Sequence, residues 1–190
     1  MATYYRPEVY KTQAASMHLT NAQVDNYLKV EFDVSAENTL IDSITKAAEE
    51  QAEEFCNLCI NDKDVTMYVT DVELDYAEPI QINLPYRGTV SSLVVKSVNE
   101  GTETTLDSSG YYLKGLSTLV IKDLNQVYTD LKITYSVTAN NLPIGLDVAI
   151  LKLCGDYYVN RTNDSVVSVV RISENTKTML RPFQDVRQWI

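Results

Sequence analysis

Two stretches of the chain repeat apolar residues at intervals of three and four, which is the spacing of one face of an α-helix. The first follows Ser35, a suitable N-cap, and its apolar row is Leu40, Ile41, Ile44, Ala47, Ala48, Phe55 and Cys59. The second starts near Pro143, and its row is Leu146, Ile150, Leu153, Cys154 and Tyr157. The pattern predicts long helices over about 36–60 and 143–161, and shorter helices over about 21–29 and 173–181.

Between the two long helices the period changes to two, which is typical of strands with one buried face. The short connections leave no room for crossover helices, so we expect an antiparallel meander over about 65–137. The predicted fold class is α+β: a small helical bundle with an antiparallel β-sheet insertion between the two long helices. Residues 1–19 are expected to form an extended N-terminal arm, and residues 20–190 a single domain.

The formal net charge of the 190 residues is −10, which narrows the range of partners. Proteins that grip duplex DNA present a basic face, so specific DNA binding is not expected. No apolar run approaches the roughly 18–20 residues of a membrane span. The chain starts without an apolar signal stretch, so we expect a protein that is made and kept in a cytoplasm, away from membranes.

Charge is unevenly distributed along the chain. Residues 166–190 carry four basic and two acidic side chains, and residues 1–19 carry two basic and one acidic, so the acidic excess lies in the body between them. Basic ends on an acidic body indicate docking onto acidic surfaces, including those of identical neighbours. The alternative is two frayed tails that have no partner.

Residues that could support catalysis are sparse. His18 is the single histidine, it falls in the expected arm, and we expect it at the surface, which excludes Ser-His-Asp and Cys-His hydrolases. Cys56 and Cys59 form a CxxC pair at a helix end, where the helix dipole disfavours a thiolate. Cys154 cannot complete a zinc site with them, so we expect all three cysteines to pack in the core.

Four carboxylates crowd one part of the first long helix: Glu49, Glu50, Glu53 and Glu54. They could hold a divalent ion or perform acid–base work, but no histidine accompanies them, so a solvated helix face is the expectation. The six glycines form no phosphate-binding loop. We therefore expect no enzymatic activity and no cofactor.

Five segments, taken in order, resemble the head–tail connector (adaptor, or head-completion) proteins of long-tailed bacteriophages. They are Ala36–Ala48, Ile80–Leu93, Leu106–Leu113, Leu131–Arg161 and Met179–Phe183. They look like the family's capped Leu-Ile and Ala-Ala helix, its strand–proline segment, its strand ending in Asp-Tyr, its strand and Pro-x-x-Leu helix, and its terminal Leu-x-Pro-Phe. Together they span about residues 20–190, which would form the connector domain. The sequence Thr138-Ala139-Asn140 departs from the glycine that the family usually has at that turn.

The resemblance implies a structural role in the virion, at the head–tail junction. Family members form a ring, typically of twelve copies, beneath the portal protein; the ring extends the DNA channel and meets the tail or the next connector protein. It would let double-stranded DNA pass without specific binding. The expected site for the portal or a neighbouring subunit is Arg181, Phe183, Arg187 and Trp189, and Glu49, Glu50, Glu53 and Glu54 are expected to face the lumen.

Several alternatives stay open. The stretch Val166–Val170 could pair with a neighbour's sheet edge or form an internal edge strand. The protein could be another ring or tail-completion protein of the virion. From a different class, it could be a small cytoplasmic metal-dependent enzyme that uses the acidic helix, or a ligand-binding domain with an apolar pocket in the β region.

Overall fold

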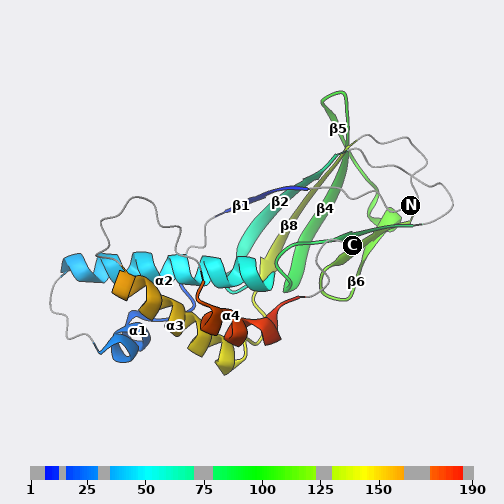
Figure 1. Ribbon diagram of the computed structural model, residues 1–190. Helices are drawn as coiled ribbons and strands as arrows, with labels where there is room; N and C mark the ends of the chain where they lie inside the picture. The colour runs from blue at the N-terminus through cyan, green and yellow to red at the C-terminus, as the bar shows by residue number, and fades with distance from the viewer. Residues whose placement is uncertain are drawn as a thin grey trace. The chain divides into compact units, whose positions relative to one another are not determined.

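The computed structural model describes residues 7–12, 16–29, 35–70, 79–122, 130–160 and 172–185. It divides the chain into two compact units. The helical unit comprises Ala15–Asn61 and Asn141–Gln184, and the β unit comprises Met1–Ala14, Asp62–Asn140 and Asp185–Ile190. The described residues contain both helices and antiparallel sheets (Figure 1), so the predicted α+β class is confirmed at that level.

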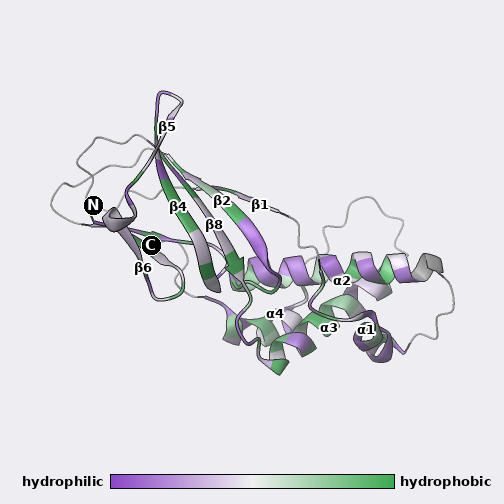
Figure 2. Ribbon diagram, turned by 180° about the vertical axis from the view of Figure 1, so that it is seen from behind, coloured by the Kyte–Doolittle hydropathy of each residue, from purple (hydrophilic) through white to green (hydrophobic). Residues whose placement is uncertain are grey.

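The described residues of the helical unit form four α-helices: α1 (Asn21–Leu28), α2 (Ser35–Cys56), α3 (Ile144–Asn160) and α4 (Glu174–Leu180), the last followed by the 3-10 turn η2 (Arg181–Phe183). Apolar side chains of α2 and α3 form the core of the unit, including Ile41, Ala48, Ala52, Leu146, Ala149, Ile150 and Leu153. Hydrophobic colour prevails along α3, whereas α2 alternates between the two colours (Figure 2). Among the described helices, none combines the length and apolar content that a bilayer span requires.

The helix α2 ends at Cys56, four residues before the end that the sequence predicts. The spacing of Phe55 and Cys59 continues the apolar row, but Asn57 adopts a left-handed conformation with φ of 50°. The Leu58 N–H then donates to the Glu53 carbonyl at 3.3 Å. A residue in the left-handed conformation, followed by a hydrogen bond from residue i to residue i−5, is a common way for a helix to end. After glycine, asparagine is among the residues that adopt the left-handed conformation most readily.

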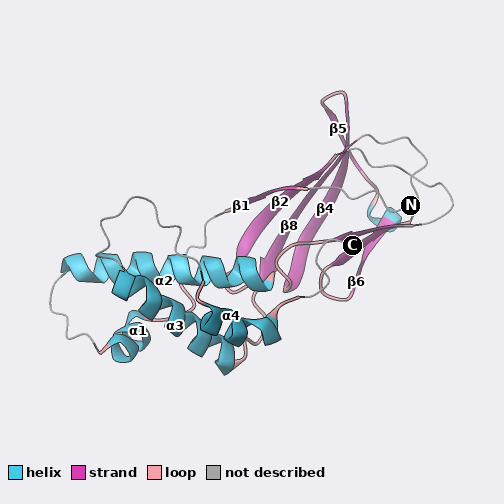
Figure 3. Cartoon of the chain, in the orientation of Figure 1, coloured by secondary structure: helices cyan, strands magenta, loops and turns pink. Residues whose placement is uncertain are grey.

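The strands that the structure describes in the β unit form two sheets (Figure 3). The five-stranded sheet has the order β1 (Glu8–Lys11), β2 (Lys63–Val69), β8 (Asp130–Thr138), β4 (Thr89–Asn99) and β5 (Thr102–Thr105). The three-stranded sheet has the order β3 (Ile80–Asn83), β7 (Thr118–Ile121) and β6 (Tyr111–Lys114), with the 3-10 turn η1 (Ser108–Gly110) before β6. Leu131, Ile133, Tyr135 and Val137 of β8 are buried and alternate with less buried residues, as the period of two predicts.

The strands are antiparallel as predicted, but the meander is wrong. The last strand, β8, lies between β2 and β4, so strands far apart in the sequence are neighbours. Within the stretch predicted as an extended arm, Glu8 to Lys11 form a strand that pairs with β2, with Glu8 opposite Tyr68. The Tyr135 hydroxyl of β8 donates to the Pro85 carbonyl, just after β3, at 2.8 Å and so joins the two sheets.

Candidate assembly surfaces

The acidic row of α2 divides into buried and exposed members. Glu49 and Glu53 are each 1% exposed, so the predicted solvated face is wrong for these two residues. Glu50 is half-buried and Glu54 is exposed. A carboxylate held inside the unit cannot line a channel, so the lumen-facing prediction stays only for Glu50 and Glu54.

The buried carboxylates accept hydrogen bonds from two other segments. Glu49 accepts from the Leu19 N–H at 2.7 Å, the His18 N–H at 3.2 Å and the Asn61 side-chain amide at 2.7 Å. Glu53 accepts from the Ile60 N–H at 2.8 Å and the Asn61 N–H at 3.0 Å. Hydrogen bonds to an ionised acceptor are about twice as strong as neutral ones. The pair therefore holds the segment before α1 and the turn after α2, which is a structural use of these acids.

The other sequence candidates for chemistry also have structural partners. His18 is half-buried rather than at the surface, with its ring Nε2 2.8 Å from Asp147 on α3. The thiols of Cys56, Cys59 and Cys154 are buried, as predicted, and none of the three is in a disulfide. Burial raises the pKa of the Cys56 and Cys154 thiols to about 12. In the part of the chain that the structure describes, no group of three or more His, Cys, Asp or Glu side chains is arranged to hold a metal ion.

The predicted C-terminal contact residues are only partly described. Arg181 is exposed and caps α4, its backbone N–H donating to the Lys177 carbonyl. Phe183 is half-buried against the core, with its ring 3.1 Å from where a Cβ on Gly145 would stand. Gly145 therefore leaves the space that the ring occupies. Arg187, Trp189 and the stretch Val166–Val170 lie outside the described residues.

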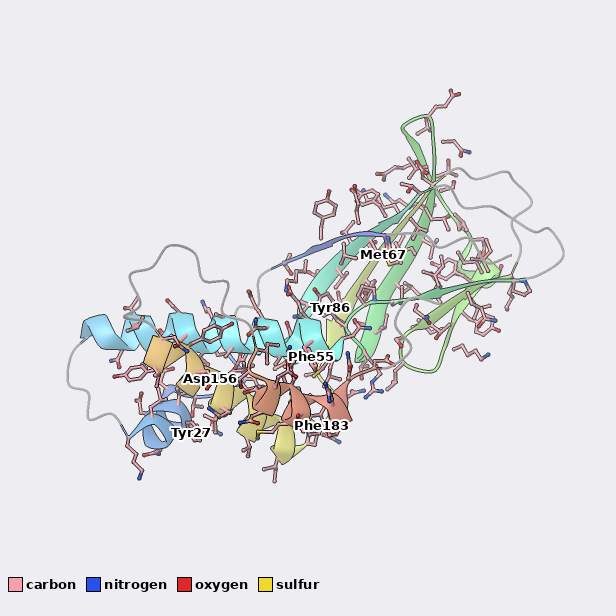
Figure 4. The ribbon with its side chains drawn as sticks, in the orientation of Figure 1. Tyr27, Phe55, Met67, Tyr86, Asp156 and Phe183 are labelled. Carbon is pink, nitrogen blue, oxygen red and sulfur yellow. The ribbon has the colours of Figure 1, made fainter. Side chains whose placement is uncertain are left out.

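Asp156 fixes α4 to α3 (Figure 4). One carboxylate oxygen accepts from Lys152 at 2.5 Å, and the other accepts from the Ser173 and Thr176 hydroxyls, both at 3.1 Å. Ser173 is also the N-cap of α4. This network sets the position of the turn that carries Arg181 and Phe183.

The helix α3 also carries a second apolar row, which the predicted single apolar face does not include. Ile144, Val148 and Val159 are among the most exposed large apolar side chains of the described residues. Their spacing of three to four residues, with Leu151 and Gly155 between them, was legible in the sequence. One apolar face is what a helix of a monomer needs, and the row at 146–157 already supplies it, so spacing alone does not predict a second one.

Comparisons with solved structures show where this fold recurs. It matches the neck of an empty gene transfer agent (GTA) particle computed with C6 symmetry, at 17% identity and a TM-score of 0.65, over 94% of this chain and 96% of the other. It also matches the neck of the native particle computed with C12 symmetry, at 16% identity and a TM-score of 0.61, over 94% and 96%. A chain of the native virion gives 16% identity and a TM-score of 0.62, over 93% and 96%.

At this low identity the likeness shows a shared fold. No protein-family model matches the chain, and no curated protein matches it in sequence. The shared fold is that of a phage-like particle's neck, and at this level it confirms the resemblance drawn from the sequence motifs.

Proposed function

We propose that this chain is a structural subunit of the neck of a phage-like particle. It forms a ring beneath the portal that joins head to tail and lets DNA pass. The observation that carries the proposal is the match to neck chains over nearly the full length of both proteins. The symmetries of those necks support a homo-oligomeric ring, twelvefold in the assembled particle. The role needs neither catalysis nor a cofactor.

The C-terminal segment is the proposed contact with the portal or a neighbouring subunit. Arg181 presents its charge on a turn fixed by the Asp156 network and by the packing of Phe183 on Gly145. A turn that is already fixed loses little backbone freedom on binding, and Arg and Trp are the side chains most often central to interfaces. Arg187 and Trp189 would extend this contact.

Glu50 and Glu54 are the proposed channel-lining acids. Acidic side chains along a bore repel DNA phosphates, so the duplex slides without sticking. The overall charge of −10 is in keeping with such a conduit.

Electron microscopy of the full chain, alone and mixed with the portal protein of the same particle, tests the ring. We expect closed rings in at least one of the two preparations, seated on the portal in the mixture. The proposal is wrong if neither preparation gives rings. A ring that seats elsewhere in a particle reconstruction would favour the alternative of another ring or tail-completion protein.

The double substitution Arg181→Glu with Trp189→Ala tests the C-terminal contact. We expect rings or subunits of this variant to bind portal about tenfold more weakly, the effect of losing about 1.4 kcal/mol at an interface centre. Lys114→Glu, an exposed basic residue of β6, is the matched control and should bind as the wild type does. Equal binding by all three proteins would contradict the docking role.

A further inference from the structure

The helix α3 is apolar on two opposite sides. One side carries the buried core residues Leu146, Ala149, Ile150, Leu153 and Cys154. At 3.6 residues per turn, the opposite side carries a second row: Ile144, Val148, Leu151, Gly155 and Val159. In this second row Ile144 is 80% exposed, Val148 45% and Val159 74%.

Such a helix is normally covered on both sides. The second row runs from Ile144 to Val159, a length of about 22 Å. Near its middle, α1 reaches the row where Tyr27 and Leu28 approach Gly155. The ring of Tyr27 is 43% exposed and widens the apolar area. We call Ile144, Val148, Val159 and Tyr27 the α3 surface. Several large apolar side chains exposed along one helix face usually mark an interaction site.

The charged side chains of α3 that flank the second row have close partners. The row itself has no charged residue. Beside it, Asp147 lies 2.8 Å from the His18 ring, and Lys152 pairs with Asp156 at 2.5 Å. A row without charged side chains offers little to DNA phosphates or to a strongly charged protein. It suits a partner that brings an apolar surface of its own.

We propose that the α3 surface is one side of the contact between neighbouring copies of this chain, an inference that rests on the ring proposed above. Identical chains close into a ring by joining two different surfaces, so each copy must offer one surface on either side. The α3 surface meets the requirement for one of them: it is apolar, uncharged, and carried by a helix fixed on its other face by the core of the helical unit. The occupant is therefore a second copy.

Two aspartate substitutions test this contact without disturbing the fold. Ile144→Asp adds an acid to the first turn of α3, where the helix dipole favours it, and Val148→Asp lies one turn further on. Leu116→Asp is the matched control, because Leu116 is 47% exposed and lies between β6 and β7 in the β unit. Circular dichroism and thermal unfolding should show that all three variants fold.

Sedimentation velocity and electron microscopy then measure ring formation under the conditions that give wild-type rings. We expect Ile144→Asp and Val148→Asp to need at least about tenfold more protein to form rings, since a charge buried in a contact costs more than about 1.4 kcal/mol. Leu116→Asp should assemble as the wild type does. Unchanged assembly of the α3 variants overturns this inference and leaves the ring intact, whereas a wild type without rings overturns the proposed function itself.

A photo-crosslinking side chain at position 148 gives a readout that does not depend on the aspartate variants folding. In wild-type-like rings we expect a product with the mass of two chains, and peptide mapping will identify the facing surface. A product that joins the chain to portal, or no two-chain product within rings, would show that another molecule, or none, covers the α3 surface.

Discussion

At the scale of single residues, Glu49 and Glu53 lie one turn apart on the inner side of α2 and bind backbone N–H groups of other segments. Each hydrogen bond gives an acceptor to a backbone N–H group that would otherwise have none. An acidic cluster in a sequence is usually read as a solvated face, because a buried carboxylate is costly without partners. Here the partners come from residues 18–19 and 60–61, on either side of α1 and α2, and no periodicity reveals that they converge.

Removing the Glu49 carboxylate should therefore be costly. We expect Glu49→Ala to lower the free energy of unfolding by about 2–4 kcal/mol. Three donors would lose their carboxylate acceptor, and the Leu19 N–H among them belongs to a buried residue. Urea unfolding measures it. Glu50→Ala, on the next position of the same helix, should change stability by no more than about 0.5 kcal/mol. Equal effects for the two variants would contradict the structural role of Glu49.

The cysteines give a second prediction at this scale. Only the thiolate reacts readily with a thiol reagent, and burial raises the pKa of Cys56 and Cys154 to about 12. At pH 8 the folded protein should label very slowly with an aromatic disulfide reagent, and all three cysteines should react once urea unfolds it. Rapid labelling of the folded chain would show that the helical core opens easily.

At the scale of elements, apolar spacing was enough to predict α2 and α3, and the period of two was enough to predict β2 and β8. The order of strands was not predictable, because β8 pairs with β2 across many intervening residues and pairing is decided by tertiary contacts. The strand β1 was missed for the same reason: four residues carry little pattern, and their partner lies far along the chain. Of the residues predicted for the C-terminal contact, Arg181 is exposed, as a contact residue must be. Of the acids predicted to face the lumen, Glu49 and Glu53 are buried.

The link between α3 and α4 can be tested through Asp156. Asp156→Ala removes the acceptor shared by Ser173, Thr176 and Lys152, so we expect a loss of about 1–3 kcal/mol and faster hydrogen exchange across α4. Exchange in α1 should change less. The control is Glu174→Ala, which removes an exposed acid from the first turn of α4. A similar rise in α4 exchange for both variants would assign the effect to the helix dipole.

In the five-stranded sheet, Glu103 of β5 lies between Lys132 and Lys96, 2.7 and 2.9 Å away. Hydrogen bonds from Lys132 and then Lys96 lower the pKa of Glu103 from 4.5 to about 2. A lowered pKa adds stability above the unfolded value, and this is lost as the pH falls from about 4.5 to about 2. A carboxyl NMR titration should give a midpoint near 2, and it should return toward 4.5 in Lys96→Met with Lys132→Met. A normal midpoint in the wild type would mean that water screens the lysines.

At the scale of the whole molecule, the chain enters the β unit from α2 and leaves it into α3. The two ends of this insertion lie together: the Ala139 N–H donates to the Asp62 carboxylate at 3.0 Å, and Lys63 pairs with Val137. Each unit therefore has its own compact set of contacts. This arrangement explains how the helices and the strands of one chain can pack as two separate units.

Replacing residues 62–140 with a short Gly/Ser linker tests that separation. Because the insertion closes at its base, we expect the shortened chain to keep a helical circular dichroism spectrum and to unfold in one cooperative transition. Calorimetry or urea unfolding measures it. Loss of cooperativity would show that the helical unit depends on the sheet for its stability.

The insertion also determines when the protein can fold during synthesis. The ribosome releases α2 long before α3, and at about 5–20 residues per second the interval between Cys56 and Ile144 lasts roughly 5–20 s. Throughout that interval the apolar row of α2 has no complete core to enter, since Leu146, Ile150 and Leu153 have not yet been made. A nascent chain stalled before Pro143 should therefore bind chaperones through α2, and the finished chain should release them.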